Sequence, residues 1–177
     1  MTTLPLLSAT AADPGCLDAF EPLEECHRET MRMLAAFERL VARLEDVGSD
    51  APARALAARV DAYFSHDLKL HHLDEEAHVF PLLEGSRDPR TVQAVARLQQ
   101  DHAWLRADWR VLSPLVRAVA AGQSWVDVDV LRDGMDVFCA LSRDHIALEE
   151  SVIYPQARIR MLESSRSEMR RAMAARR

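Results

Sequence analysis

Apolar residues recur every three to four positions through four long segments of this 177-residue chain, the spacing of the buried face of a helix. Gly48 and Gly85 stand where the first two segments stop, and glycine favours the backbone turn that ends a helix. Pro52 and Pro89 stand in the first turn of the second and third segments, where proline is tolerated. Short connectors between four such helices predict an all-α fold, an up-down-up-down four-helix bundle. The predicted helices cover approximately residues 22–46, 50–84, 89–122 and 127–154.

Two further features refine this organisation. Pro114 lies inside the third segment and is expected to kink or loosen its last turns. Ser165 and Glu168 have the spacing of a capping box, which predicts a short arginine-rich C-terminal helix after Ser165. The expected organisation is a mobile N-terminal tail over 1–19, the bundle over 20–157, and a basic C-terminal helix or tail over 158–177.

Composition narrows the classes of function. The net charge of −6 argues against nucleic acid as a partner. No apolar run approaches the roughly 18 residues of a membrane-spanning helix. The three cysteines, Cys16, Cys26 and Cys139, have no CxxC spacing, so a disulfide framework is not expected and a reducing cytoplasm fits best. Cys26 is next to His27, but neighbours on a helix point about 100° apart, so this thiol is not expected to be a ligand.

One motif occurs twice and carries the chemistry. A histidine is followed four residues later by a pair of glutamates, and then by an aromatic residue and a proline. A single histidine precedes each copy, by 44 residues in the first case and 43 in the second. The copies are His71, Glu75, Glu76, Phe80, Pro81 and His145, Glu149, Glu150, Tyr154, Pro155, preceded by His27 and His102.

This repeat predicts a site for two metal ions. A histidine and a glutamate four residues apart lie on the same face of a helix, so both can point to the bundle axis. Imidazole suits iron, zinc or copper, and a carboxylate can bridge two ions lying about 3.5–4 Å apart. At least one position on each ion then stays open for a small ligand. The predicted ligands are His27, His71, Glu75, His102, His145 and Glu149.

Two ligand positions have competitors. The repeat aligns His71 with His145, and the helical face through His72 passes Ser65 and Lys69, so His72 is expected to be the wetter neighbour. The same logic prefers the first glutamate of each pair. The alternative or outer-shell candidates are His72, Glu76, His78, Arg106 and Glu150.

A purely structural role for these residues is the competing interpretation. A single His-x3-Glu pair often only stabilises a helix, and His66 and His78 are expected to have solvated or outer-shell roles. Burying two carboxylates and four imidazoles without a cation would, however, cost several kcal/mol. The metal interpretation is therefore preferred.

The string from His71 to Glu76, His-His-Leu-Asp-Glu-Glu, together with the other motif residues, resembles the hemerythrin-like HHE cation-binding family over about residues 20–157. The resemblance implies a four-helix bundle around two non-haem iron ions, with an oxo or hydroxo bridge as one form. Carried over by position, His27, His71, His102 and His145 are terminal ligands, and Glu75 and Glu149 bridge. The oxygen-carrying members have a further histidine where this chain has Arg106, so the site is expected to be one histidine short of theirs.

The expected function is that of a cytoplasmic di-iron protein that binds dioxygen or a related small oxidant, peroxide or nitric oxide, for sensing or redox chemistry. Two alternatives stay open at this point. One is a non-catalytic, metal-responsive iron-binding module, and the other is a hydrolase with zinc or manganese at the same site. The expected partner is a small diatomic ligand or peroxide, and whether the protein is an enzyme is left open.

Overall fold

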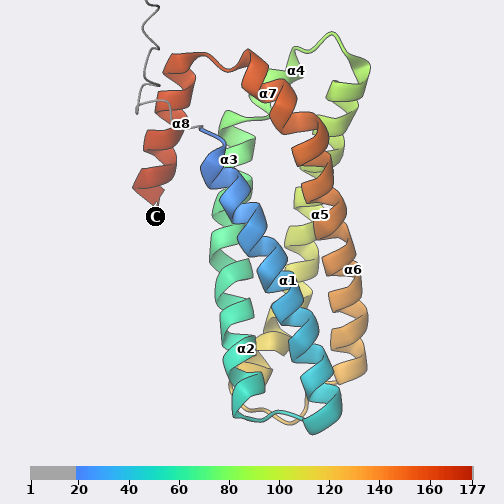
Figure 1. Ribbon diagram of the computed structural model, residues 1–177. Helices are drawn as coiled ribbons and strands as arrows, with labels where there is room; N and C mark the ends of the chain where they lie inside the picture. Colours follow the sequence, from blue (N-terminus) through green and yellow to red (C-terminus); the bar gives the residue numbers. More distant parts are fainter. Residues whose placement is uncertain (1–18, 177) are drawn as a thin grey trace, which may run out of the picture.

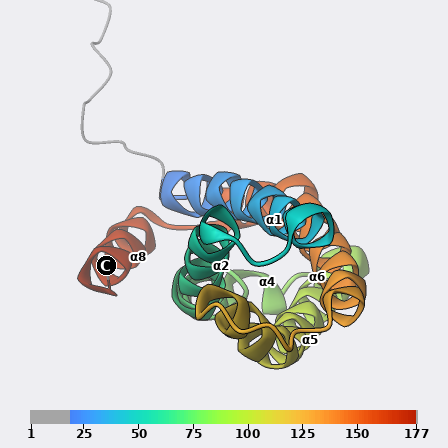
Figure 2. The ribbon, with the colours of Figure 1, turned by 90° about the horizontal axis from the view of Figure 1, so that it is seen from below.

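The computed structural model describes residues 19–176, and every regular element in this range is helical. Four helical columns run alternately down and up and pack side by side, and the end-on view shows them surrounding a common axis (Figures 1 and 2). The predicted four-helix bundle is therefore confirmed. The columns are α1 (Glu21–Val47); α2 (Ala51–Ala62) with η1 (Tyr63–Asp67), α3 (Leu68–His78) and α4 (Pro81–Glu84); α5 (Pro89–Ala120); and α6 (Val128–Leu148) with η2 (Glu149–Ile153) and α7 (Tyr154–Arg160).

The helix starts and stops follow the local sequence. Gly48 ends α1 at a φ of 78°, a left-handed conformation that costs glycine little. The Asp50 carboxylate accepts a hydrogen bond of 2.9 Å from the Ala53 N–H and so caps α2. Asp88 caps α5 in the same way. Pro114 lies within α5, which continues as one helix to Ala120.

The second and fourth columns each contain a wider, π-helical turn, η1 and η2. A related irregularity occurs in both copies of the repeat. Phe80 and Tyr154 each donate the backbone N–H to the carbonyl five residues earlier, that of the first glutamate of the pair. The next residue in each copy is a proline, which has no N–H to continue the usual four-residue ladder. The two motif copies thus share a backbone distortion as well as a sequence.

Two apolar clusters fill the bundle, one at each end, and a polar layer separates them. Burial of apolar surface in the two clusters, at about 25 cal/mol per Å², supplies the stability that permits a buried polar layer. The first cluster includes Phe37, Leu40, Phe64, Leu112, Leu131 and Phe138. The second includes Phe20, Leu23, Phe80, Leu98, Ile153, Met169 and Met173.

A further helix, α8 (Glu163–Arg176), lies outside the four columns and packs against α3 (Figure 1). Met169 and Met173 bury their side chains, and Arg176 forms an ion pair with Asp74 of α3. The helix begins before Ser165, so the predicted cap at Ser165 is wrong. The expected N-terminal tail lies outside the described residues except for Ala19, which is buried.

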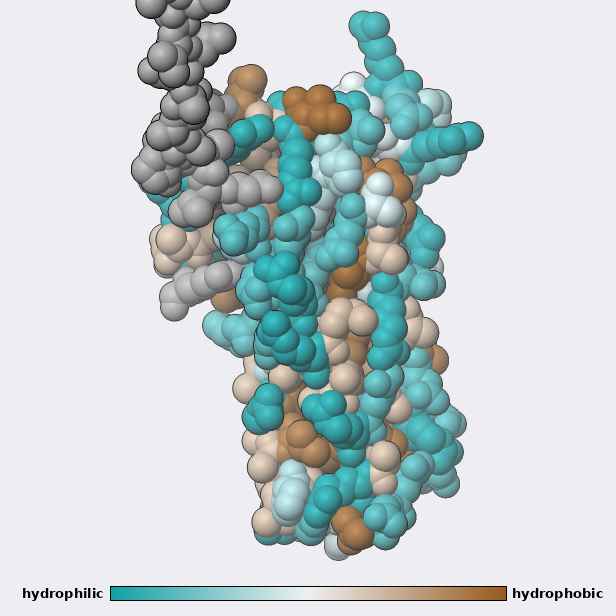
Figure 3. Space-filling view, viewed as in Figure 1, coloured by the Kyte–Doolittle hydropathy of each residue, from teal (hydrophilic) through white to brown (hydrophobic). Residues whose placement is uncertain are grey.

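The surface of the α1 face is mostly hydrophilic, with only scattered apolar side chains (Figure 3). Among the described residues, no helix combines the length and the hydropathy needed to cross a membrane.

Candidate metal centre

Seven ionisable side chains meet in the polar layer between the two apolar clusters. All four columns contribute to this group, and none of its members is more than 4% exposed. The six predicted ligands are brought together, and His72 joins them. The group consists of His27 from α1; His71, His72 and Glu75 from α3; His102 from α5; His145 from α6; and Glu149 from η2.

The histidines divide into two sets around the two glutamates. Within each set the donor atoms all lie within 4.8 Å of one another. Glu75 and Glu149 have donor atoms close to histidines of both sets. We call the first set, His27 and His71, the His27 side, and the second set, His72, His102 and His145, the His102 side.

Each glutamate directs one carboxylate oxygen to each side. Glu149 places Oε2 3.1 Å from Nε2 of His27 and Oε1 3.2 Å from Nε2 of His145. This is the disposition of a carboxylate that bridges two ions, one on each side. Glu75 does the same, with Oε1 3.5 Å from Nε2 of His71 and Oε2 3.4 Å from Nε2 of His102.

Many of these donor atoms have no hydrogen-bond partner among the described residues. Both carboxylate oxygens of Glu149 and both ring nitrogens of His71 are buried and form no hydrogen bond with a described residue. Nε2 of His72 and Oε2 of Glu75 are also buried without such a hydrogen bond. Each such group costs about 1–3 kcal/mol when left unsatisfied. A set of inward-facing nitrogen and carboxylate donors without partners fits two bound metal ions.

A second carboxylate supports the lone histidine of each half. Glu150 Oε1 lies 3.0 Å from Nδ1 of His27, and Glu76 Oε1 lies 2.8 Å from Nδ1 of His102. A histidine that donates from Nδ1 keeps the lone pair of Nε2 for a metal. Arg106 donates to the same oxygen of Glu76 at 2.9 Å. In both cases the second glutamate of one motif copy orients the lone histidine that precedes the other copy.

Burial sets the charge of the centre. It lowers the pKa of His71 to about 3 and that of His72 well below its ordinary value, so both imidazoles are neutral near neutral pH. Burial, reinforced by the charge of Glu75, raises the pKa of Glu149 well above its ordinary value. Burial also acts to raise the pKa of Glu75, but the nearby histidines outweigh it and hold that pKa well below its ordinary value. A bound cation would relieve this conflict by allowing both carboxylates to ionise.

The expectation that His72 lies on a wetter face is wrong. His72 is 2% exposed, and its ring stacks on His102 with 3.9 Å between the ring centroids. The π-helical turn η1 explains the error, because it adds one residue to the turn that contains Ser65. The residues after this turn are rotated about the helix axis, so His72 does not lie on the face that a regular helix would share with Ser65. With His72, five buried imidazoles line the centre although residue 106 is an arginine.

The other candidates lie around the centre. The Glu150 side chain is 50% exposed, unlike that of Glu149, and its carboxylate contacts His27. Arg106 pairs with Glu76 at the edge of the centre. His66 is exposed, and His78 is half-buried with Nε2 unpaired, and neither belongs to a group of converging donors.

Comparison with known proteins agrees with this geometry. The family model described as the hemerythrin HHE cation-binding domain matches residues 18–157, a range that contains all seven residues of the centre. The chain belongs to the hemerythrin HHE cation-binding family. An uncharacterized protein of Haemophilus influenzae is 28% identical to it over 160 residues, which cover 90% of each chain. The resemblance that the sequence motifs indicated is thus confirmed.

Tyr154 touches the centre of this HHE domain, although the sequence drew attention to it only as part of the repeat. Its hydroxyl donates a hydrogen bond of 2.6 Å to Oε1 of Glu75 and lies 3.1 Å from Nε2 of His27. Its ring stacks on the His27 ring at 5.2 Å. Phe80, at the same place in the other copy, packs on His102 and has no hydroxyl. In the sequence, the repeated aromatic-proline pair was the one feature that could have drawn attention to Tyr154.

Asp101 is a second HHE-domain residue that the sequence did not single out. It is 1% exposed, and its Oδ2 lies 3.8 Å from Nδ1 of His145 and 3.6 Å from Nε of Arg97. Carboxylates at this position commonly orient a metal-binding histidine. Asp101 directly precedes His102, just as Cys26 directly precedes His27. This shared position was the only feature of the sequence that could have pointed to Asp101.

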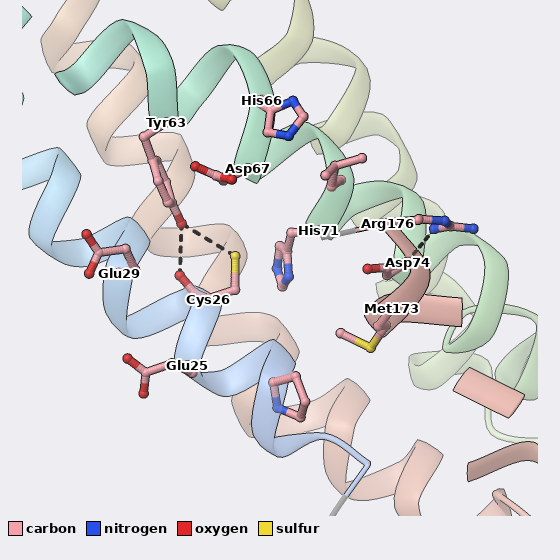
Figure 4. Close-up of a pocket in the computed structure, with 12 residues that line it drawn as sticks. Glu25, Cys26, Glu29, Tyr63, His66, Asp67, His71, Asp74, Met173 and Arg176 are labelled. Atoms are coloured by element: carbon pink, nitrogen blue, oxygen red, sulfur yellow. Dashed lines mark hydrogen bonds and ion pairs between the residues drawn. The ribbon is translucent and has the colours of Figure 1, made fainter. Parts of the chain in front are cut away.

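A small cavity of about 10 Å³ adjoins the centre of the HHE domain. It is lined by His27, Thr30, Leu68, His71, His72, Leu105, Ser142, His145 and Ile146. A larger pocket of about 430 Å³ lies between α1, α3 and α8 and reaches His71 from the surface (Figure 4). In it, Tyr63 donates to the backbone oxygen of Cys26 at 3.0 Å, and Asp74 meets Arg176. The centre is buried but lies close to the surface beside His71.

Proposed function

We propose that this HHE domain holds two non-haem iron ions and binds dioxygen or a related small oxidant, peroxide or nitric oxide, for sensing or redox chemistry. The observation that carries the proposal is the cavity of about 10 Å³ beside the four histidines His27, His71, His72 and His145. A cavity of that size holds about one water molecule, so it selects very small ligands. The apolar side chains of Leu68, Leu105 and Ile146 favour an uncharged molecule there.

The donor count suggests where such a ligand binds. The His27 side offers two imidazoles and one oxygen from each shared glutamate, or four donors. The His102 side offers four matching donors from His102, His145 and the two glutamates, and His72 adds an imidazole beside His102 and His145. Iron prefers up to six donors and zinc usually four, so the set favours iron. The His27 side then keeps more open positions, and we assign the small ligand to it.

The surrounding residues supply the remaining chemistry. When bound, an iron pair supplies electrons and open coordination positions for a small oxidant. The Tyr154 hydroxyl holds a proton at the His27 side through its hydrogen bond to Glu75. Glu76 and Glu150 fix the direction of the His102 and His27 rings. The apolar walls limit the access of water.

The alternatives receive less support from the cavity. A zinc or manganese hydrolase needs an acid or base beside the attacking water. Apart from the four histidines, the described residues that line the cavity are Thr30, Leu68, Leu105, Ser142 and Ile146, and none of these is an acid or a base. A metal-responsive module without ligand chemistry would leave the cavity without a role.

Anaerobic reconstitution with ferrous iron tests the proposal. Metal quantification should give two iron ions per chain, and dioxygen, hydrogen peroxide or nitric oxide should each change the optical or Mössbauer spectrum. A protein loaded with two irons that shows no spectral response to any of the three would overturn the ligand-binding proposal. Uptake of zinc in strong preference to iron would overturn the metal assignment.

A further inference from the structure

A second large pocket, of about 460 Å³, opens between the second column and α5. Its volume is in the range that accommodates small organic ligands. Aromatic and aliphatic side chains form its inner wall, and cationic side chains complete its lining. We call it the basic pocket; it is lined by Phe64, Ser65, Leu68, Lys69, His72, Leu105, Arg106, Trp109, Arg110, Ser113, Pro114, Arg117 and Phe138.

Two helix irregularities account for this pocket. On one wall, the π-helical turn η1 widens the second column at Phe64 and Ser65. On the other wall, Pro114 interrupts the hydrogen-bond ladder of α5, because it cannot donate to the carbonyl of Arg110. An interruption of regular helix thus lies on each of two opposite walls of the pocket.

The charge of the basic pocket is one-sided. Four cations line it, and none of its described lining residues is acidic. Arg106 is paired with Glu76 and Arg117 with Asp61. Lys69 and Arg110 are exposed and have no ion-pair partner among the described residues. The pocket therefore has two uncompensated positive charges in a protein whose net charge is −6.

The pocket beside His71 provides a contrast. Its lining contains the acids Glu25, Glu29, Asp67 and Asp74, with Arg176 as its cation. His71 and His72 are neighbours on α3, and side chains of neighbouring residues point about 100° apart. The two faces of α3 thus open to pockets of opposite charge, which indicates that the basic pocket has a ligand preference of its own.

We propose that the basic pocket binds a small organic anion that has an apolar, ring-sized body and one carboxylate. The body fits against Phe64, Trp109 and Phe138, and the carboxylate faces Lys69 and Arg110 at the mouth. The site shares Leu68, His72 and Leu105 with the small cavity, so the bound anion lies next to the His102 side of the centre. The binding is a property of the protein walls and does not depend on the proposed iron chemistry.

A ligand series of constant shape tests this site. Phenylpropionate, phenylpropanol and phenylpropylammonium have the same body and differ in the charge of the head group. Trp109 lies in the pocket, and a W104F/W125F background leaves it as the single tryptophan of the chain, so its fluorescence reports binding. Phenylpropionate should bind about tenfold more tightly than the alcohol, and added salt should weaken it. The cation should bind most weakly.

Charge removal at the mouth supplies the matched variant. K69Q/R110Q should weaken phenylpropionate binding about fivefold to tenfold and leave phenylpropanol binding unchanged. The control R39Q removes an exposed arginine of α1 and should change neither. Both metal-free and iron-loaded protein should give this pattern. Absence of binding, equal affinity for the three head groups, or insensitivity to K69Q/R110Q would each overturn the proposal, whereas failure to bind iron would leave it intact.

Discussion

The His27 side and the His102 side arise from two copies of one motif, yet their surroundings differ at three points. The His27 side has two imidazoles and the His102 side has three, because His72 joins the second set. Tyr154 contacts the first side and Phe80 the second. The residue before the lone histidine is Cys26 in one half and Asp101 in the other.

These differences all suit the two sides to different roles. The His102 side has more nitrogen donors and a carboxylate beside His145, so on our proposal it would hold its ion more firmly. The His27 side has fewer donors and a hydroxyl that can donate a hydrogen bond, so it is equipped for an exchangeable ligand. A nearly symmetric frame therefore supports an asymmetric centre, and the following substitutions test this comparison from the largest expected effect to the smallest.

Replacing either shared glutamate should affect both sides together. E75Q and E149Q should each lose both ions, with a fall in affinity greater than the 10- to 100-fold known for outer-shell partners, because each carboxylate directs an oxygen to both sides. Metal quantification after dialysis measures this. The exposed Glu84 provides the control E84Q, which should retain two ions. Loss of a single ion from E149Q would show that Glu149 serves one side only.

Replacing one of the adjacent histidines of α3 should separate the two sides. H71L should remove the ion of the His27 side, because three donors then remain there, whereas H72L should only weaken binding on the His102 side, where His102, His145 and the two shared glutamates remain. Metal stoichiometry measures the loss, and iron spectroscopy identifies which ion remains. Each variant serves as the control for the other. If H72L keeps two ions at unchanged affinity, His72 is not a ligand, and the four-histidine site predicted from the motif is correct.

Removing the carboxylate charge beside His145 should weaken one side selectively. D101N should lower metal affinity on the His102 side by up to about 10-fold, because it removes the buried negative charge that faces the His145 ring at 3.8 Å. Competition with a chelator measures this change. The corresponding variant C26S should have little effect, since a thiol gives weak orientation. Equal losses in the two variants would contradict the proposed difference between the sides.

Removing the Tyr154 hydroxyl should make the two sides more alike. Y154F leaves Oε1 of buried Glu75 without its donor and should lower the stability of the metal-free protein by about 1–3 kcal/mol. Urea unfolding measures this. The only other tyrosine gives the control Y63F, which loses hydrogen bonds to Thr30 and Cys26. Y63F should destabilise the protein without altering the spectrum of bound iron, whereas Y154F should alter it.

Periodicity and local signals were sufficient to predict the four helices. The caps at Asp50 and Asp88 and the stop at Gly48 depend on neighbouring residues alone, so they could be located from the sequence. The repeat likewise predicted six side chains that the structure brings together. Two copies with the same spacing place their histidine and glutamate on the same face of their helices, so both faces could be predicted.

The remaining features depend on contacts across the bundle. The burial of His72 depends on the π-helical turn η1, and nothing in a regular helical pattern marks an added residue in one turn. Tyr154 reaches Glu75 in the other half, and Asp101 reaches His145 on another helix. Spacing within one helix carries no information on such pairs. Only the packed structure identifies them.

The pairing of Glu76 with His102 and of Glu150 with His27 means that each hairpin supplies the carboxylate that orients a histidine of the other. Neither hairpin alone holds a complete set of donors. A chain cut in the connection between Glu84 and Pro89 should therefore yield two fragments whose reassembly is templated by the ions, with cation uptake and fragment docking forming a single equilibrium.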